Sequence, residues 1–126
     1  MSIREYFNRL NRIFDSCAHL NTYDLTFDER TNEIGYVKGA LYFPKGIELH
    51  FREYVDVARN EKYKYAYHVM RDTELVFRYD NADDVQAREL ESYPHHKHLA
   101  DGSVTEAEEQ SLQDVLAEIE ALLFEG

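Results

Sequence analysis

The apolar pattern at the start of the chain repeats with the period of a helix. Its members are Ile3, Phe7, Leu10, Phe14 and Cys17. Because they recur every three or four positions, they predict an amphipathic helix over residues 3–19. Ser2 and Glu5 have the spacing of a capping box, so we expect this helix to begin after Ser2.

The pattern then changes to an alternation with period two. Five segments show it, all rich in β-branched and aromatic residues: 22–27, 34–43, 47–57, 62–70 and 74–80. Such segments are typical of half-buried strands. The breaks between them are short and turn-like, which favours antiparallel neighbours. We therefore predict a five-stranded antiparallel meander.

Residues 81–104 show no clear period, which predicts a long connection of the kind that often carries function. Residues 105–124 return to helical spacing, and Thr105 with Glu108 forms a second capping box. Both helices have one apolar stripe, so we expect both to cover the same face of the sheet. The predicted fold class is α+β, with residues 1–126 as a single domain.

The uncovered face of the predicted sheet gathers basic and imidazole side chains. Strand alternation assigns to it Glu48, His50, Arg52, Tyr54 and Asp56 from the third strand, Lys62, Lys64 and His68 from the fourth, and Arg78 and Asp80 from the fifth. Opposed side chains in an antiparallel pair approach to about 5 Å, so these groups form one patch if the alternation holds. An ordinary solvent face with cross-strand ion pairs is the alternative.

The stretch YPHHKH at residues 93–98 holds three imidazoles beside Lys97. It permits three interpretations: a metal site with Asp80 or Asp101, a lid that carries acid and base groups over the sheet face, or a solvated loop. Zinc sites commonly use paired cysteines or a helical HExxH, and neither is present. We therefore predict no metal ligands and no cofactor. Cys17 is the only cysteine and is expected to be buried.

Charge does not exclude a nucleic-acid ligand. The net charge of the 126 residues is −11, but residues 100–126 hold eight acids and no Lys or Arg, and residues 1–99 hold 17 acids against 14 bases. Phosphate binding needs a local basic patch rather than a basic whole. We see neither a signal peptide nor an apolar stretch of the roughly 18 residues that a membrane span requires, so a cytoplasmic protein is expected.

RNA cleavage without a metal needs the residue types of this patch. Histidine transfers protons near neutral pH, Arg and Lys stabilise phosphate charge, and Tyr stacks on unpaired bases. The candidate catalytic residues are Arg52, His68, Arg78, Asp80, His95, His96 and His98, and the candidate substrate-binding residues are His50, Tyr54, Lys64 and Lys97. Two alternatives stay open: a non-catalytic module that binds a partner protein, and a divalent-metal protein centred on the histidine cluster.

Four sequence blocks follow one another along the chain: LHFREYVD at 49–56, YKYAYHVM at 63–70, LVFRYDNA at 75–82 and YPHHKHL at 93–99. Their order resembles that of the TumE-type toxin family of prokaryotic toxin–antitoxin pairs. The resemblance implies a toxin neutralised by a cognate antitoxin of the helix-turn-helix type. It also suggests, by analogy with RelE-like toxins that pack helices on one antiparallel sheet, that the substrate is RNA. The positions that match the family blocks are Arg52, Arg78, Asp80, His95, His96 and His98.

Overall fold

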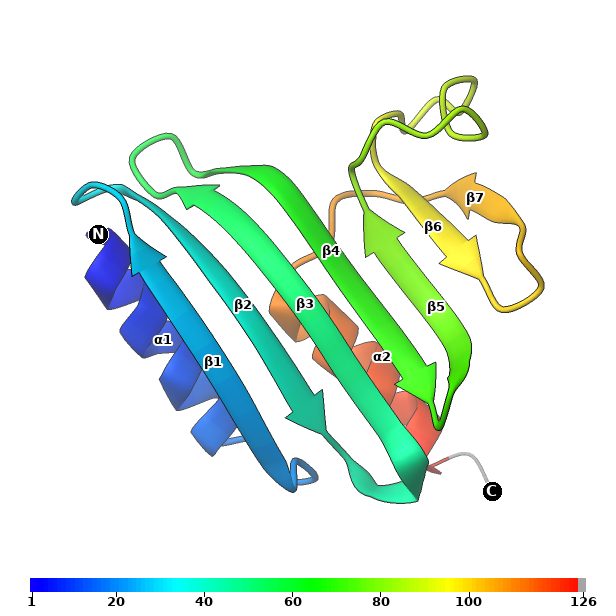
Figure 1. The fold of residues 1–126 in the computed structure, drawn as a ribbon, viewed down its shortest axis with the longest axis horizontal. Coiled ribbons are helices and arrows are strands. Elements are labelled where there is room, and N and C mark those ends of the chain that lie inside the picture. Colours follow the sequence, from blue (N-terminus) through cyan, green and yellow to red (C-terminus); the bar gives the residue numbers. More distant parts are fainter. Residues whose placement is uncertain (125–126) are drawn as a thin grey trace.

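The computed structural model describes residues 1–124, and Glu125, one of the eight terminal acids, lies outside them. Within this range, one antiparallel sheet contains seven strands in chain order (Figure 1). The strands are β1 (Thr22–Glu29), β2 (Ile34–Tyr42), β3 (Ile47–Asp56), β4 (Glu61–Arg71), β5 (Glu74–Asp80), β6 (His96–Leu99) and β7 (Val104–Glu106). A short 3-10 turn, η1 (Pro44–Gly46), connects β2 to β3, and the two helices are α1 (Ile3–Asp15) and α2 (Leu112–Phe124).

The five predicted strands are confirmed, but the prediction of a five-stranded sheet is wrong. β6 and β7 lie within or next to the stretch that was expected to be a long connection, and they extend the sheet beyond β5. These strands have only 4 and 3 residues. β6 reads His-Lys-His-Leu, so its alternation is not one of apolar against polar residues and gives no period-two hydrophobic signal.

Both helices cover the same face of the sheet, as predicted (Figure 1). The Phe7 ring of α1 stacks on Phe27 of β1 at 4.4 Å between ring centroids. In α2, Val115 and Ile119 are fully buried. Gly35 lets α1 approach β2, because an added Cβ would lie 2.6 Å from Cγ1 of Ile3. The opposite face of the sheet carries no helix within residues 1–124, and we call it the open face.

The ends of the helices differ from the prediction in two places. α1 begins as expected, with the backbone N–H of Glu5 donating to Ser2 Oγ at 3.1 Å, but it ends at Asp15. α2 begins at Leu112, where the Asp114 N–H donates to Ser111 Oγ at 3.1 Å and the Ser111 N–H donates to Asp114 Oδ2 at 2.9 Å. Thr105 is not a helix cap, because it pairs with Lys97 between β7 and β6.

A bulge in β4 reverses the predicted alternation at one position. The register between β3 and β4 shifts at Tyr54/Val55, so that Tyr54 lies opposite Lys64 and Val55 opposite Lys62. Lys62, predicted on the open face, therefore lies on the helix face, where its Nζ donates to Tyr67 Oη at 2.7 Å. One extra residue in a strand is enough to change the face of the side chains beyond it.

The helices among residues 1–124 are too short and too polar to cross a bilayer.

Candidate functional site on the open face

Two rows of opposed residues cross the open face. The first row runs from β2 to β6 through Lys38, Arg52, Ala66, Asp80 and His96. The second row runs through Ala40, His50, His68, Arg78 and His98 on the same strands. The rows are two residues apart on each strand, so all their side chains share one face.

The centre of the open face is hollowed into a groove of about 510 Å³. Ala40 and Ala66 line it, and these short side chains leave space between larger neighbours. His50 and His68 lie directly opposite each other across β3 and β4, with Arg52 beside His50 on its own strand. Opposed side chains of this kind are about 5 Å apart at Cβ, so the groove brings two imidazoles together.

Arg78 connects the groove to the histidines of β6. Its Nη1 lies 3.4 Å from His68 Nδ1, and its Nε donates to Asp80 Oδ2 at 2.9 Å. Asp80 Oδ1 lies 3.1 Å from His96 Nε2, and Asp80 Oδ2 lies 3.3 Å from His98 Nε2. A continuous polar network therefore runs from β4 through β5 to β6.

The electrostatic environment of His68 favours its neutral form. Partial burial lowers the pKa of this imidazole below 6.5, and the positive charge of Arg78 lowers it further, with smaller contributions from His50 and His98. Desolvation and like charges both penalise an imidazolium. At neutral pH the His68 ring is thus suited to accept a proton.

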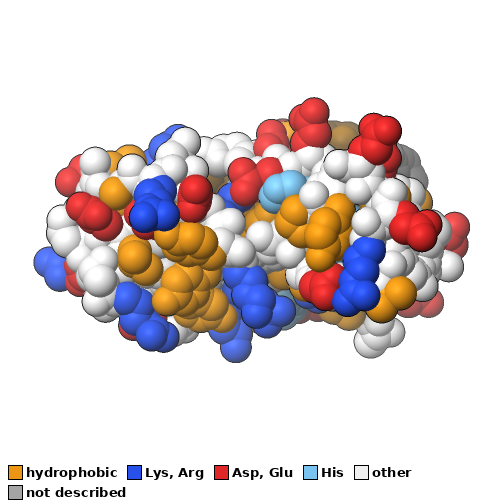
Figure 2. Space-filling model, turned by 90° about the horizontal axis from the view of Figure 1, so that it is seen from above, with side chains coloured by type: hydrophobic (Ala, Val, Ile, Leu, Met, Phe, Trp, Pro, Cys, Tyr) orange, Lys and Arg blue, Asp and Glu red, His pale blue; other side chains and the backbone are white. Residues whose placement is uncertain are grey.

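Charge is unevenly distributed over the molecule. In the view from above, Lys and Arg side chains gather along the lower margin, whereas Asp and Glu are prominent in the upper and right-hand parts (Figure 2). Lys38 and Arg52 are exposed on the open face, and neither has a carboxylate partner among residues 1–124. The acidic net charge of the chain therefore coexists with a basic groove.

The structure brings together seven of the eleven residues proposed from the sequence: His50, Arg52, His68, Arg78, Asp80, His96 and His98. Tyr54 and Lys64 share the open face but lie opposite each other at the bulge, outside the groove lining. Tyr54 instead packs near Tyr36 and Tyr63, with ring centroids 6.3 and 6.2 Å away.

His95 and Lys97 lie on the helix face. The His95 Nδ1 is 2.8 Å from Tyr65 Oη, and Lys97 Nζ donates to Glu118 Oε2 of α2 at 2.8 Å. Of the three interpretations of YPHHKH, the structure does not have the lid over the groove. Residues 96–98 form part of β6, and strand alternation sends their side chains to opposite faces. Asp101, considered as a metal ligand, instead binds Ser103 in the turn that follows β6.

Sequence reasoning missed Lys38, which lines the groove and lies opposite Arg52. The signal was present, since the alternation of residues 34–42 places Tyr36, Lys38 and Ala40 on one face.

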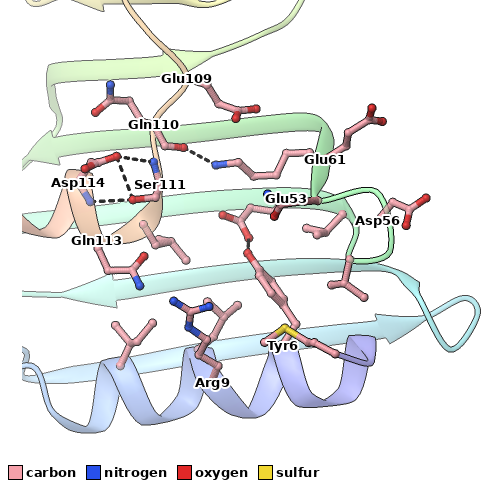
Figure 3. Close-up of a pocket in the computed structure, with 18 residues that line it drawn as sticks. Tyr6, Arg9, Glu53, Asp56, Glu61, Glu109, Gln110, Ser111, Gln113 and Asp114 are labelled. Carbon is pink, nitrogen blue, oxygen red and sulfur yellow. Dashed lines mark hydrogen bonds between the residues drawn. The ribbon is translucent and has the colours of Figure 1, made fainter.

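A second polar group, also missed, lies on the helix face. Glu53 is 1% exposed and accepts hydrogen bonds from the hydroxyls of Tyr6 and Tyr67. It lines a pocket of about 340 Å³ between α1 and the segment before α2, where Glu53 and Tyr6 point toward each other (Figure 3). Lys62 also lines it and donates to the backbone carbonyl of Gln110. We call Tyr6, Glu53, Lys62 and Tyr67 the Glu53 cluster.

The Glu53 cluster is poorly suited to proton transfer near neutral pH. Burial and the charge of Glu53 raise the pKa of Tyr6 and of Tyr67 far above 10, so both hydroxyls stay protonated and donate to the carboxylate. Burial lowers the pKa of Lys62, while the neighbouring carboxylates oppose that shift. A fully satisfied buried network of this kind holds elements together.

The family model described as Toxin TumE matches residues 10–123. The chain therefore belongs to the TumE toxin family, and the resemblance seen in the sequence blocks is confirmed. No curated protein and no solved structure matches the chain. The analogy with RelE-like toxins consequently has no support from solved structures.

Proposed function

Because the chain belongs to the TumE toxin family, we propose that it is the toxin of a toxin–antitoxin pair and that it cleaves RNA in the groove of the open face. One observation carries the proposal: His50 and His68 lie opposite each other in a groove that Arg52 and Arg78 also line. Two imidazoles between two guanidiniums provide a base, an acid and phosphate binding in one place.

The two histidines take complementary roles in the proposed reaction. Neutral His68 accepts the proton of a ribose 2′-hydroxyl, and the 2′-oxygen attacks the adjacent phosphorus. As the bond from phosphorus to the 5′-oxygen breaks, His50 donates a proton to that leaving oxygen. The products are a 2′,3′-cyclic phosphate and a 5′-hydroxyl end. No step requires a metal ion.

The cations of the groove bind and stabilise the phosphate. Arg78 is held by Asp80 at 2.9 Å, which fixes one edge of its guanidinium. Arg52 and Lys38 lie opposite each other on β3 and β2 and are exposed. Guanidinium groups bind phosphate through paired N–H donors, and this stabilisation grows as charge develops in the transition state. Tyr36 also lines the groove and provides a ring on which an unpaired base can stack.

The cellular setting follows from the family. Membership implies a cognate antitoxin that neutralises the toxin. We extend this to an antitoxin of the helix-turn-helix type, encoded beside the toxin, and to action in the cytoplasm, where the RNA lies. Sequencing of the neighbouring genes tests this part of the proposal: we expect a gene for a small helix-turn-helix protein, and we expect the two proteins to co-purify.

Inducible expression in a bacterial host, followed by inspection of total RNA, tests the activity. We expect growth arrest and new RNA fragments with 5′-hydroxyl ends. With purified protein, His68→Gln and His50→Gln each lower the cleavage rate by about 10²–10⁴-fold, the usual contribution of a positioned acid or base. Cleavage persists in excess chelator.

His19→Gln is the matched control, because His19 lies outside the open face and contacts Phe124 of α2. We expect this variant to cleave RNA at the wild-type rate. Intact RNA with folded wild-type protein, or equal activity of folded His68→Gln and wild type, would contradict the proposal.

A further inference from the structure

Asp80, His96 and His98 direct their ligand atoms toward one point at the junction of β5 and β6. His96 Nε2 lies 3.1 Å from His98 Nε2 and 3.1 Å from Asp80 Oδ1, and His98 Nε2 lies 3.3 Å from Asp80 Oδ2. The register produces this arrangement, because Asp80 lies opposite His96, and His98 follows two residues later on the same face. Two imidazoles and a carboxylate thus converge from neighbouring strands.

The surrounding contacts orient these atoms as they orient metal ligands. His96 Nδ1 lies 2.8 Å from the carbonyl oxygen of Pro94, so this nitrogen carries the hydrogen and donates it. The Nε2 lone pair of His96 then points toward the cluster. Asp80 is fixed as well, since its Oδ1 accepts from the Ala82 N–H at 3.0 Å and its Oδ2 from Arg78 Nε at 2.9 Å. Ligating histidines and carboxylates in metalloproteins typically have such outer contacts.

With a hydrogen on Nδ1, the imidazole of His96 presents its Nε2 lone pair to Asp80 Oδ1. His96 Nε2 and Asp80 Oδ1, which both carry lone pairs, are nevertheless only 3.1 Å apart. Both side chains are buried, with exposures of 0% for His96 and 4% for Asp80. A positive charge between them stabilises the contact, whether it is a proton or a metal ion. A metal ion with bonds of about 2.0–2.2 Å separates its ligand atoms by roughly 3.0–3.5 Å. The three contacts lie in this range, with Asp80 using Oδ1 toward His96 and Oδ2 toward His98.

We propose that Asp80, His96 and His98 bind one divalent transition metal ion of the zinc class. Imidazole with carboxylate suits zinc, iron, copper or nickel better than magnesium or calcium. The ion joins β5 to β6 and so holds the β6–β7 extension on the sheet. Three protein ligands leave one position for water or another ligand, and His98, with 24% of its side chain exposed, lies on the accessible side. The ion takes no part in the cleavage proposed for His50 and His68, although its ligand Asp80 also holds Arg78 beside the groove.

Metal analysis of protein made without a polyhistidine tag tests the proposal. We expect about one equivalent of metal per chain after zinc is supplied and excess is removed by dialysis. Cobalt(II) added to the chelator-treated protein should give visible d–d absorption that zinc abolishes. Zinc should also raise the melting temperature by about 5 °C or more, since a ligand that binds only the folded state stabilises it.

Three substitutions make the test specific. Asp80→Asn and His98→Ala should each weaken metal affinity by more than the 10–100-fold that outer contacts contribute. His95→Ala is the matched control, because His95 belongs to the same histidine run but contacts Tyr65 on the helix face. This variant should bind metal with wild-type affinity. Circular dichroism confirms that each variant is folded.

Two results would overturn the metal site. One is folded wild-type protein that binds less than about a tenth of an equivalent of zinc and of cobalt, which leaves a proton as the shared charge. The other is folded His98→Ala protein with undiminished cobalt absorption. Neither measurement involves RNA, so the metal site and the proposed cleavage can fail independently. Cleavage measured in chelator, well below the melting temperature of the metal-free protein, separates the two further.

Discussion

Arg52 and Glu53 are neighbours in β3, but they face environments that differ in almost every respect. Arg52 is exposed on the open face, beside His50 in its own strand and Lys38 in β2. Glu53 is 1% exposed and accepts two tyrosine hydrogen bonds under α1. The difference shows how one strand separates roles. On the groove side, Arg52 has no carboxylate partner among residues 1–124, whereas on the helix side the Glu53 carboxylate is fully hydrogen-bonded.

The largest expected difference between the two faces is in stability. Glu53→Ala removes the acceptor of the Tyr6 and Tyr67 hydroxyls and leaves a small cavity, so we expect the free energy of unfolding to fall by about 3 kcal/mol. Urea unfolding at pH 7 measures it. Arg52→Ala, one residue away, should change stability by less than about 0.5 kcal/mol while lowering RNA cleavage. Equal losses of stability in the two variants would remove the distinction.

The start of α2 gives a smaller effect on the helix side. Ser111→Ala removes the hydroxyl that accepts the Asp114 N–H, and we expect a loss of about 1 kcal/mol in unfolding free energy. Thr105→Ala serves as the control, since Thr105 lies in β7 and caps no helix. It should cost less than Ser111→Ala. A larger loss of unfolding free energy for Thr105→Ala than for Ser111→Ala would instead support a helix that begins at Thr105, as the sequence predicted.

The pH dependence of cleavage tests the groove side. If His68 is the base, cleavage rises as this imidazole loses its proton with increasing pH. Because burial and Arg78 lower the pKa of His68, we expect the rise below pH 6.5. Folding follows the same sign: between the two pKa values the unfolded chain binds the proton more readily, so stability falls as pH drops below 6.5. The rate profile measures the pH midpoint of cleavage, and an NMR titration measures the pKa of the His68 ring. A midpoint above pH 6.5 in either measurement would contradict the assignment of His68 as the base.

Much of the fold was predictable from local patterns. Period-two alternation gave five strands whose bounds match β1 to β5 within about two residues, and helical spacing gave both helices and the face that they cover. Alternation also predicted that His50, Arg52, His68, Arg78 and Asp80 share a face. Such patterns succeed because a half-buried element must keep its apolar residues on one side.

Two features of the helix face could not be predicted from local patterns. Glu53 breaks the apolar alternation of β3, and only the tyrosines that α1 and β4 bring beside it explain its burial. Lys62 changes face because a bulge adds one residue to β4. The partners of Glu53 come from other elements, and the bulge is a matter of pairing between β3 and β4, so the period of one strand's own sequence reveals neither.

The stretch YPHHKH at residues 93–98 shows the limit of what the sequence by itself determined. The sequence determined that three imidazoles lie within four residues of a proline and that Asp80 ends a strand. The tertiary structure decided that residues 96–98 pair with β5, which sends His96 and His98 to Asp80 and leaves His95 and Lys97 on the helix face. The physical reason is that β6 is too short and polar for hydrophobic burial to reveal it locally. Its face is set by hydrogen-bond register with a neighbouring strand.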